Sequence, residues 1–284
     1  MTYPLPVTST TRTLALLGDP VGHSLSPVIQ NAALAATGLD GVYVALRVAD
    51  GDLSGLMRGL AAAGGGGNIT LPHKERAAAA VDRPTEAVRR TGACNTFWYE
   101  DGELHGDNTD VEGLRRAIHS HLQGTVEGGR VLILGAGGAA RAALAAVLDD
   151  GAAEVEIHNR TVERARAVAR RLGGTRTRVL ESRNDLQGRR YDLILNTTRL
   201  GLNPEDPLPL TPEQEVSSPA VLDLVYTPGE TEWVRQARAS GIHAMDGGEM
   251  LVQQGVVAFE RWWGIPGPAE VMREALDRLR RSGS

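Results

Sequence analysis

Short apolar runs alternate with amphipathic stretches of helical length through the middle of the chain. The apolar runs have the length of strands and cover residues 130–134, 154–158, 192–196 and 221–225. The stretches with helical spacing follow some of these runs. One is alanine-rich and runs through residue 148, and the others cover residues 162–172 and 231–240. Strands that alternate with helices of this length form a parallel sheet with helices on both faces. We therefore predict an α/β, doubly wound domain over residues 111–246.

The rest of the chain also mixes strand and helix patterns. Predicted strands cover residues 14–17, 41–46 and 68–71, and predicted helices cover residues 27–37, 53–63, 75–80, 249–263 and 269–281. We expect the last two helices to pack back against the first part of the chain. The chain then has two lobes, a first domain over residues 1–110 that residues 247–284 complete, and the doubly wound domain between them. The apolar tail around Trp262 and Trp263 fits either the core or the interface of a homodimer.

Composition excludes several classes of protein. Hydrophobic residues make up 42% and charged residues 23% of 284 positions, which is typical of a globular protein. A net charge of −5 argues against nucleic acid or an anionic membrane as a partner. The longest apolar stretch is interrupted by Arg141, and the N-terminus lacks the pattern of a signal peptide. Cys94 is the only cysteine, which excludes an intramolecular disulfide and fits a cytoplasmic location.

A glycine-rich turn lies between the first strand and the first helix of the doubly wound domain. Its residues are Gly135, Ala136, Gly137, Gly138 and Ala139, followed by Ala140. Glycines in this context let backbone amides approach a pyrophosphate at the N-terminus of a helix. The turn therefore predicts a site for a dinucleotide cofactor.

The end of the next strand indicates which dinucleotide binds. An NAD enzyme usually has an acidic residue there, which accepts hydrogen bonds from the ribose hydroxyls. This chain has Asn159, Arg160 and Thr161, with Arg164 one helical turn later. Guanidinium groups can bind a 2′-phosphate through charge-assisted hydrogen bonds, so the segment favours NADP. The alternative is that these arginines form a solvated helix face, as Arg166 does.

Two serines flank the start of the first predicted helix, in the sequence His23-Ser24-Leu25-Ser26-Pro27. Ser26 has the position of an N-cap, with proline at the first helical position. A helix N-terminus with two hydroxyl groups is also a natural site for a carboxylate. Both interpretations can hold together.

The chain has 30 basic residues, and Lys74 is the only lysine among them. A lone lysine in an arginine-rich chain suggests a position that needs a compact ammonium able to give up a proton. Lys74 follows Asn68 and Thr70, which lie on one face of a predicted strand. Asn95 and Asp110 follow in further polar segments, although each segment alone could be a turn, and Asp110 could cap the helix that begins near residue 111.

Taken together, these segments resemble the shikimate dehydrogenases. The motifs occur in the family's order along nearly the whole chain, as HSLSP, NITLPHK, GACNTF, GDNTD, GAGGAAR, NRTVER, DLVY and MLVQQ. The resemblance implies a substrate-binding domain followed by a Rossmann-type domain that binds NADP. It also implies reversible, NADPH-dependent reduction of 3-dehydroshikimate to shikimate, a step toward chorismate and the aromatic amino acids.

The resemblance carries site roles onto matching positions. Lys74 and Asp110 would form the catalytic pair at the reacting oxygen. The substrate contacts would be Ser24, Ser26 and Tyr226 at the carboxylate, Thr70, Asn95 and Gln254 at the ring hydroxyls, and Asn68 in the same wall. The cofactor contacts would be Gly135 to Ala139 at the pyrophosphate, Asn159, Arg160, Thr161 and Arg164 at the 2′-phosphate, Leu224 and Gly247 at the nicotinamide, and Thr198. Arg199 departs from the NATS sequence of many members, which leaves the adenine-side contacts open.

We expect Lys74 to act as the acid in reduction and the base in oxidation, with Asp110 orienting it. A neighbouring carboxylate favours the charged ammonium and opposes its use as a base, whereas burial has the opposite effect. Two alternatives remain, a quinate/shikimate dehydrogenase that uses NAD, and a non-catalytic regulator that binds shikimate. Cys94 lacks a partner base, and His119 and His121 have the wrong spacing for a metal on one helix face, so we predict neither a nucleophile nor a metal site.

Overall fold

The chain divides into two compact units in the computed structural model, which describes residues 7–203, 205–211, 216–227 and 229–282. The first unit combines the chain up to Gly113 with Leu251–Ser282, and the second runs from Leu114 to Met250. The boundaries fall inside helix α5 (Thr109–Leu122) and helix α9 (Gly248–Trp263). The sequence prediction had divided the chain after residues 110 and 246.

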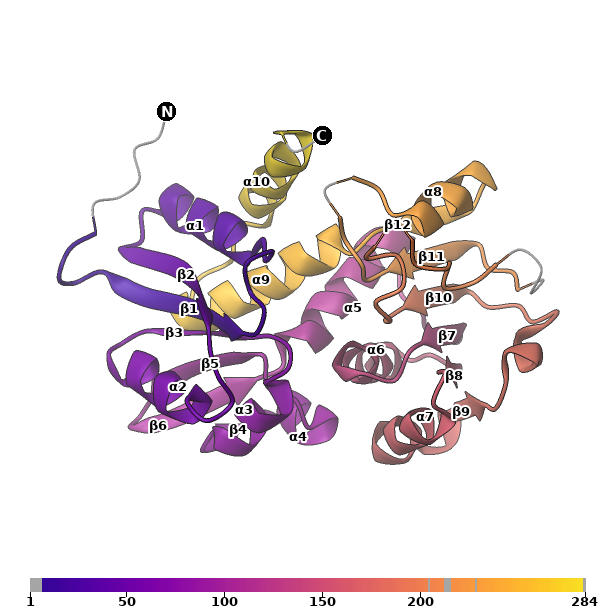
Figure 1. The fold of residues 1–284 in the computed structure, drawn as a ribbon, viewed down its shortest axis with the longest axis horizontal. Helices are drawn as coiled ribbons and strands as arrows, with labels where there is room; N and C mark the ends of the chain where they lie inside the picture. The colour runs from indigo at the N-terminus through magenta and orange to yellow at the C-terminus, as the bar shows by residue number, and fades with distance from the viewer. Residues whose placement is uncertain (1–6, 204, 212–215, 228, 283–284) are drawn as a thin grey trace. The chain divides into compact units, whose positions relative to one another are not determined.

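The first unit is built on a six-stranded mixed sheet (Figure 1). In spatial order its strands are β2 (Gly41–Arg47), β1 (Arg12–Gly18), β3 (Gly66–Ile69), β5 (Thr96–Glu100), β6 (Glu103–Asp107) and β4 (Arg83–Pro84). β1 pairs in parallel with β2 and β3, whereas β5 pairs antiparallel with both β3 and β6. The carboxyl ends of β1 and β3 therefore meet at one edge, where the polar motifs begin.

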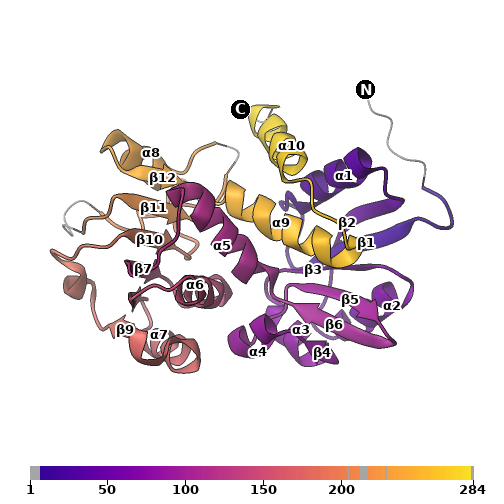
Figure 2. The same ribbon diagram turned by 180° about the vertical axis from the view of Figure 1, so that it is seen from behind.

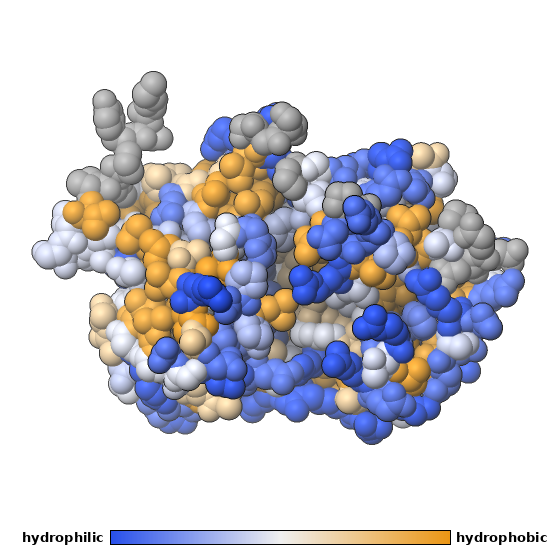
Figure 3. Space-filling view, in the orientation of Figure 1, coloured by the Kyte–Doolittle hydropathy of each residue, from blue (hydrophilic) through white to orange (hydrophobic). Residues whose placement is uncertain are grey.

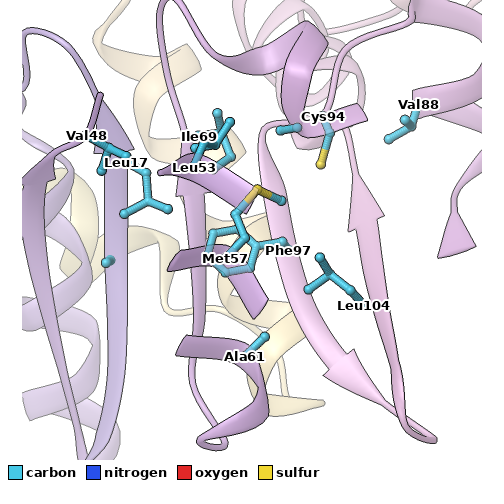
Figure 4. Close-up of a cluster of buried hydrophobic side chains, with 12 residues drawn as sticks. Leu17, Val48, Leu53, Met57, Ala61, Ile69, Val88, Cys94, Phe97 and Leu104 are labelled. Carbon is cyan, nitrogen blue, oxygen red and sulfur yellow. The ribbon is translucent and has the colours of Figure 1, made fainter. Parts of the chain in front are cut away.

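One face of this sheet is covered by α2 (Leu53–Ala62), α3 (Lys74–Ala80) and α4 (Glu86–Thr91). Alternate residues of β1 point to this face, and Leu17 packs there with Ile69, Met57 and Phe97 (Figure 4). These side chains are almost fully buried. The core thus holds β3 and the start of α3 in a fixed relation.

The C-terminal helices, from Leu251 onward, belong to the same unit. Helix α10 (Ala269–Ser282) packs against α1 (Ser26–Thr37), and the two lie beside each other in Figures 1 and 2. In α9 the buried Trp262 donates an indole hydrogen bond to the carbonyl oxygen of Phe97, at 3.2 Å. Trp263 stacks with Arg12, at 4.7 Å from the guanidinium carbon to the ring centroid. Both tryptophans therefore serve the core of this unit.

The glycine run before Asn68 is part of a buried strand. A Cβ atom on Gly67 would lie 2.0 Å from the carbonyl oxygen of Ala15, so only glycine allows β3 to pair this closely with β1. The strand predicted over residues 68–71 lies two residues earlier in the structure, because β3 begins at Gly66 and ends at Ile69. These glycines are buried because the backbones of β1 and β3 pack closely. The pattern of hydrophobic residues in the sequence does not indicate such burial.

The second unit contains a six-stranded sheet in which all paired strands are parallel. In spatial order they are β12 (His243–Met245), β11 (Ala220–Asp223), β10 (Leu193–Asn196), β7 (Arg130–Leu134), β8 (Glu154–His158) and β9 (Thr177–Leu180). The helices are α6 (Gly138–Asp149), α7 (Val162–Val168) and α8 (Glu232–Ala239), with short π and 3-10 segments at Ala169–Gly173, Gly174–Arg176 and Arg183–Leu186. The strand order reverses between β7 and β10, which is the position where doubly wound sheets bind ligands.

Both faces of this sheet are buried. Leu132 and Leu134 of β7 pack with Trp233 and Val234 of α8. Val131 and Ile133 are equally buried and must point to the opposite face. This pattern confirms the predicted doubly wound α/β domain. The predicted helix over residues 162–172 is shorter, because α7 ends at Val168 and continues as the π segment.

The outer surface carries mostly polar side chains on the face drawn in Figure 3, where apolar residues form smaller patches. Among the described helices, none is both long and apolar enough to cross a membrane.

Candidate active site

Lys74 and Asp110 form an ion pair in the first unit. Lys74 is the first residue of α3, and Asp110 lies in the first turn of α5. The Lys74 Nζ lies 2.5 Å from the Asp110 Oδ2, and the two side chains are 22% and 13% exposed. The Lys74 ammonium is thus held in place by Asp110, and it is exposed enough for a ligand to reach it.

Asn95 completes this arrangement from the opposite side. Its Nδ2 donates to the Asp110 Oδ1 at 2.8 Å, and its Oδ1 accepts the backbone N–H of Thr109 at 2.7 Å. The buried Asn95 amide therefore fixes both the carboxylate and the start of α5. Asp110 lies inside the helix and engages Lys74 and Asn95, so the alternative that it only caps a helix near residue 111 is wrong.

Asn68 of β3 contacts Asn95, the residue that holds the Lys74–Asp110 pair. The buried Asn68 donates to the carbonyl oxygen of Asn95 at 3.0 Å and to the Thr96 hydroxyl at 2.9 Å, and it accepts from the Tyr43 hydroxyl at 2.8 Å. The Asn68 side chain thus makes its hydrogen bonds within the protein. Thr70 follows at the strand end, half-buried, and within the described residues its hydroxyl has no hydrogen-bond partner.

Ser24 and Ser26 lie at the N-terminus of α1. The N–H of Ser26 donates to the Ser24 Oγ at 3.3 Å, and the two hydroxyls are also 3.3 Å apart. The helix begins at Ser26, its N-cap is Leu25, and no side chain caps it. The prediction that Ser26 is the N-cap was therefore wrong, because Ser26 is already the first residue of the helix. The first amides of the helix are nevertheless bonded, since Ser24 accepts from Ser26, and the carbonyl oxygen of Leu25 accepts from Val28 and Ile29.

Gln254 approaches the site from α9. A Cβ atom on Gly113 would lie 2.6 Å from the Gln254 Cα, so glycine lets α5 and α9 cross in close contact. Gly113 is one turn after Asp110, which brings the glutamine to the same helix face. The Gln254 Nε2 donates to the carbonyl oxygen of Leu251 at 2.8 Å. The first unit thus gathers most of the expected substrate contacts, whereas Tyr226 lies in the second unit.

The glycine turn of the second unit has the form that a pyrophosphate requires. Gly135 has a φ of +117°, and a Cβ atom there would lie 2.5 Å from the Thr197 Oγ1. A Cβ atom on Gly137 or Gly138 would meet nothing within 4 Å. Ala136 and Ala139 flank these glycines, and no side chain caps α6. Open space in front of uncapped backbone amides fits the dinucleotide that the sequence indicated.

The arginines after β8 are exposed. Within the described part of the chain, Arg160 and Arg164 form no ion pair, whereas Arg166 is bound to Glu181 at 2.6 Å. The Asn159 Nδ2 donates to the carbonyl oxygen of Thr161 at 2.8 Å and shapes the start of α7. Two guanidinium groups without counterions at this strand end fit a 2′-phosphate.

Leu224 and Gly247 lie together at the ends of β11 and β12, where the N–H of Gly247 donates to the carbonyl oxygen of Val225 at 3.0 Å. Beneath this turn lies Asp223, a residue that the sequence analysis missed. It accepts from Asn196 at 2.8 Å, and burial raises the pKa of its carboxyl to about 6. Asp223 ends β11 and directly precedes Leu224, an expected cofactor contact, and this position in the sequence could have indicated it.

His73 was also missed, although it belongs to the NITLPHK motif. It is buried directly before Lys74, and its Nε2 lies 2.8 Å from the carbonyl oxygen of Val48. Its Nδ1 lies 3.1 Å from an Asp50 carboxylate oxygen. His73 therefore ties the start of α3 to the loop after β2.

Cys94 is fully buried, and burial raises the pKa of its thiol to about 12. Its Sγ donates to the carbonyl oxygen of Thr96 at 3.3 Å. A thiol in this state is a packing residue, in agreement with the prediction. Among the residues that the structure describes, no cluster of histidine, cysteine or acidic side chains could hold a metal ion.

Comparison with known proteins identifies the family to which this chain belongs. Residues 16–97 match the shikimate dehydrogenase substrate binding domain, residues 117–199 the shikimate / quinate 5-dehydrogenase model, and residues 247–276 the shikimate 5′-dehydrogenase C-terminal domain. The chain is 45% identical to the shikimate dehydrogenase (NADP(+)) of Rubrobacter xylanophilus, over 94% of this chain and 95% of the relative. The chain belongs to the shikimate dehydrogenase family.

Solved structures of the family have the same two-domain α/β fold with a Rossmann-type second domain, as predicted. A shikimate dehydrogenase from Thermus thermophilus, in complex with NADP(H) and shikimate, is 37% identical, with a TM-score of 0.85 over 94% of this chain and 99% of that chain. One from Listeria monocytogenes, in complex with shikimate and NAD, is 30% identical, with a TM-score of 0.85 over 95% and 98% of the two chains.

Proposed function

We propose that this chain is an oxidoreductase that reversibly reduces 3-dehydroshikimate to shikimate with NADPH, on the route to chorismate and the aromatic amino acids. The observation that carries the proposal is the Lys74–Asp110 pair, held by Asn95 in the unit that matches the substrate binding domain of the family. A charged ammonium, fixed but accessible, is the group that carbonyl reduction needs beside the reacting oxygen.

The reaction adds a hydride to the carbonyl carbon and a proton to the carbonyl oxygen. The nicotinamide supplies the hydride when NADPH is bound. As negative charge develops on the oxygen, Lys74 stabilises it and donates the proton, which leaves a neutral amine that solvent reprotonates. Asp110 keeps the ammonium in place, and Asn95 prevents the carboxylate from rotating away. In the reverse direction Lys74 accepts the proton from the hydroxyl.

The start of α1 supports recognition of the substrate carboxylate. The hydroxyls of Ser24 and Ser26 lie at the N-terminus of a 12-residue helix, whose dipole favours a negative charge there. Tyr226 would assist there, as family resemblance implies. Thr70 and Gln254 would bind the ring hydroxyls, since both lie next to elements that carry the ion pair. Asn68 and Asn95 would act mainly through their contacts with the fold.

Preference for NADP is supported by the charges after β8. The unpaired Arg160 and Arg164, with Asn159 and Thr161 shaping the turn, would hold the 2′-phosphate, and no acidic residue at this strand end would repel it. Thr198, Leu224 and Gly247 would line the rest of the cofactor. The curated relative from Rubrobacter xylanophilus is named as an NADP(+) enzyme, in agreement with this proposal.

The proposal is tested by following NADPH absorbance after adding 3-dehydroshikimate to the purified protein, with NADH in a parallel reaction. We expect rapid loss of NADPH and much slower loss of NADH. Equal use of both cofactors would refute the role of the arginines. No turnover with either, despite tight binding of shikimate, would refute the enzyme and favour a regulatory binding protein.

A second candidate is a quinate/shikimate dehydrogenase that uses NAD. The observation in its favour is the Listeria monocytogenes structure, which contains shikimate and NAD. The same assay run in the oxidative direction, with shikimate and quinate as substrates, decides between the two. A cytoplasmic location and a homodimer remain predictions, which cell fractionation and mass measurement in solution would check.

A further inference from the structure

Arg199 has an exposed side chain. It follows Thr198 in the loop after β10, and within the described residues it forms no ion pair or side-chain hydrogen bond. A charged side chain without such partners among the described residues is available for a ligand.

The loop that carries Arg199 is nevertheless firmly held. The Asn196 Oδ1 accepts from the Thr198 hydroxyl at 2.7 Å, and the Asn196 Nδ2 donates to the carbonyl oxygen of Leu200 at 3.1 Å. Asn196 is itself fixed by the buried Asp223, at 2.8 Å. The backbone on both sides of Arg199 is thus positioned in advance, and binding would need to order only one side chain.

The same loop lies against the glycine turn. A Cβ atom on Gly135 would lie 2.5 Å from the Thr197 Oγ1 and 3.2 Å from the Thr198 Cγ2. The Thr197 hydroxyl also donates to the carbonyl oxygen of Leu134, directly before the turn, at 2.6 Å. The loop and the turn therefore flank the point where the strand order of the sheet reverses, and Arg199 belongs to this loop.

We propose that Arg199 binds the pyrophosphate of the cofactor and so adds an ion pair to the contacts of the backbone amides. The inference rests on the proposed function, since it concerns the same NADP site. The pyrophosphate is the anion nearest to this loop, because the arginines expected at the 2′-phosphate follow β8, on the other side of β7. A guanidinium also presents two parallel donors that suit a phosphate.

The test compares Arg199→Ser with the unchanged protein by calorimetric titration of NADP⁺, NAD⁺, ADP-ribose and adenosine 2′-monophosphate. The first three contain the pyrophosphate, and only NADP⁺ and the last contain the 2′-phosphate. We expect the substitution to weaken the three pyrophosphate ligands by a common factor of about tenfold or more, as for loss of a charged hydrogen bond. Adenosine 2′-monophosphate should bind as before.

Two further variants serve as controls. Arg160→Ser should show the complementary pattern, with weaker NADP⁺ and adenosine 2′-monophosphate and unchanged NAD⁺. Arg170→Ser removes another exposed arginine of the same unit and should change none of the affinities. Arg199→Lys should retain part of the affinity, because it keeps the charge but loses the paired donors.

Three outcomes would overturn the inference. A loss confined to NADP⁺ and adenosine 2′-monophosphate would assign Arg199 to the 2′-phosphate. An equal loss for all four ligands would assign it to the adenosine, and no loss at all would make it a surface arginine. None of these touches the proposed function, which fails instead if the unchanged protein does not bind NADP⁺.

Discussion

The ammonium nitrogen of Lys74 is both held in place and accessible to a ligand. Its ammonium is held by Asp110, and it remains 22% exposed, so a ligand can reach it. Arginine could provide the charge, but it cannot give up a proton under ordinary conditions. The preference for lysine at this single position, in a chain otherwise rich in arginine, is explained if proton transfer is required there.

Substitution of Lys74 tests this explanation. Lys74→Ala should lower kcat for reduction of 3-dehydroshikimate by about 100-fold or more, the usual contribution of a general acid. Lys74→Arg should be nearly as slow, although it keeps the charge. Binding of shikimate, measured by titration, serves as the control for an intact site. A loss of less than roughly tenfold for alanine, or near-normal turnover for arginine, would exclude the proton-transfer role.

Asp223 shows how a residue outside the expected contacts can organise a site. Its Oδ1 accepts from Asn196 and from the N–H of Val225, and its Oδ2 accepts from Thr231 at 2.8 Å. These bonds join the loop after β10, the turn after β11 and the start of α8. Burial nevertheless raises the pKa of its carboxyl to about 6, which links protonation of this residue to folding.

The raised pKa of Asp223 predicts a pH dependence. Between about pH 4 and pH 6 the folded protein keeps a proton that the unfolded chain releases, so the stabilising effect of this proton is complete at lower pH and is lost as pH rises through 6. Asp223→Asn preserves the shape and removes the titration. The stability of the unchanged protein relative to this variant should fall by on the order of 3 kcal/mol from pH 4 to pH 7. Urea denaturation of both proteins checks this, and a constant difference would contradict it.

At the scale of elements, glycines have three distinct uses. In β3 they permit close pairing of strands, since a Cβ atom on Gly67 would collide with Ala15. In the turn after β7, Gly135 adopts a positive φ beside Thr197, whereas Gly137 leaves empty space before the amides of α6. The first two uses concern folding, and only the last concerns a ligand.

Alanine substitutions separate these uses. Gly135→Ala would place a methyl group 2.5 Å from the Thr197 Oγ1 in a strained backbone conformation, and should destabilise the protein by about 1–3 kcal/mol. Gly137→Ala meets no atom and should leave the unfolding temperature unchanged, yet weaken NADP⁺ about tenfold or more, or roughly 1.4 kcal/mol, by filling the approach to the pyrophosphate. Thermal unfolding and titration measure both. Normal NADP⁺ binding by Gly137→Ala would contradict the site.

The elements that the sequence predicted have regular alternation, and those that it missed lack it. The missed helices and strands are β4, α4, β5, β6, β9 and β12. β5 and β6 form a hairpin whose turn residues, Asp101 and Gly102, have φ values of 51° and 81°. Asp-Gly is a known signal for such a turn, so this hairpin was predictable. The others are short or lie in polar sequence, and only tertiary pairing stabilises them.

At the scale of the whole molecule, the chain passes from the first unit to the second and back. The first unit therefore depends on residues far apart in sequence, because most of α9 and all of α10 belong to the unit whose first strand begins at Arg12. The motifs predicted the composition of both candidate sites. They did not predict that Asn68 and Asn95 are held by internal hydrogen bonds, or that His73 and Asp223 support the turns, because these facts depend on contacts between distant segments.

This division predicts that each ligand protects a different set of backbone amides from hydrogen exchange. NADP⁺ should slow exchange at residues 135–139 and 159–164, because it binds the second unit. Shikimate alone should slow exchange at residues 24–26 and 68–74, in the first unit. Amides of α10 serve as an internal control and should change little with either. Protection by NADP⁺ confined to the first unit, or by shikimate to the second, would contradict the assignment, since bound ligands stabilise the segments that they contact.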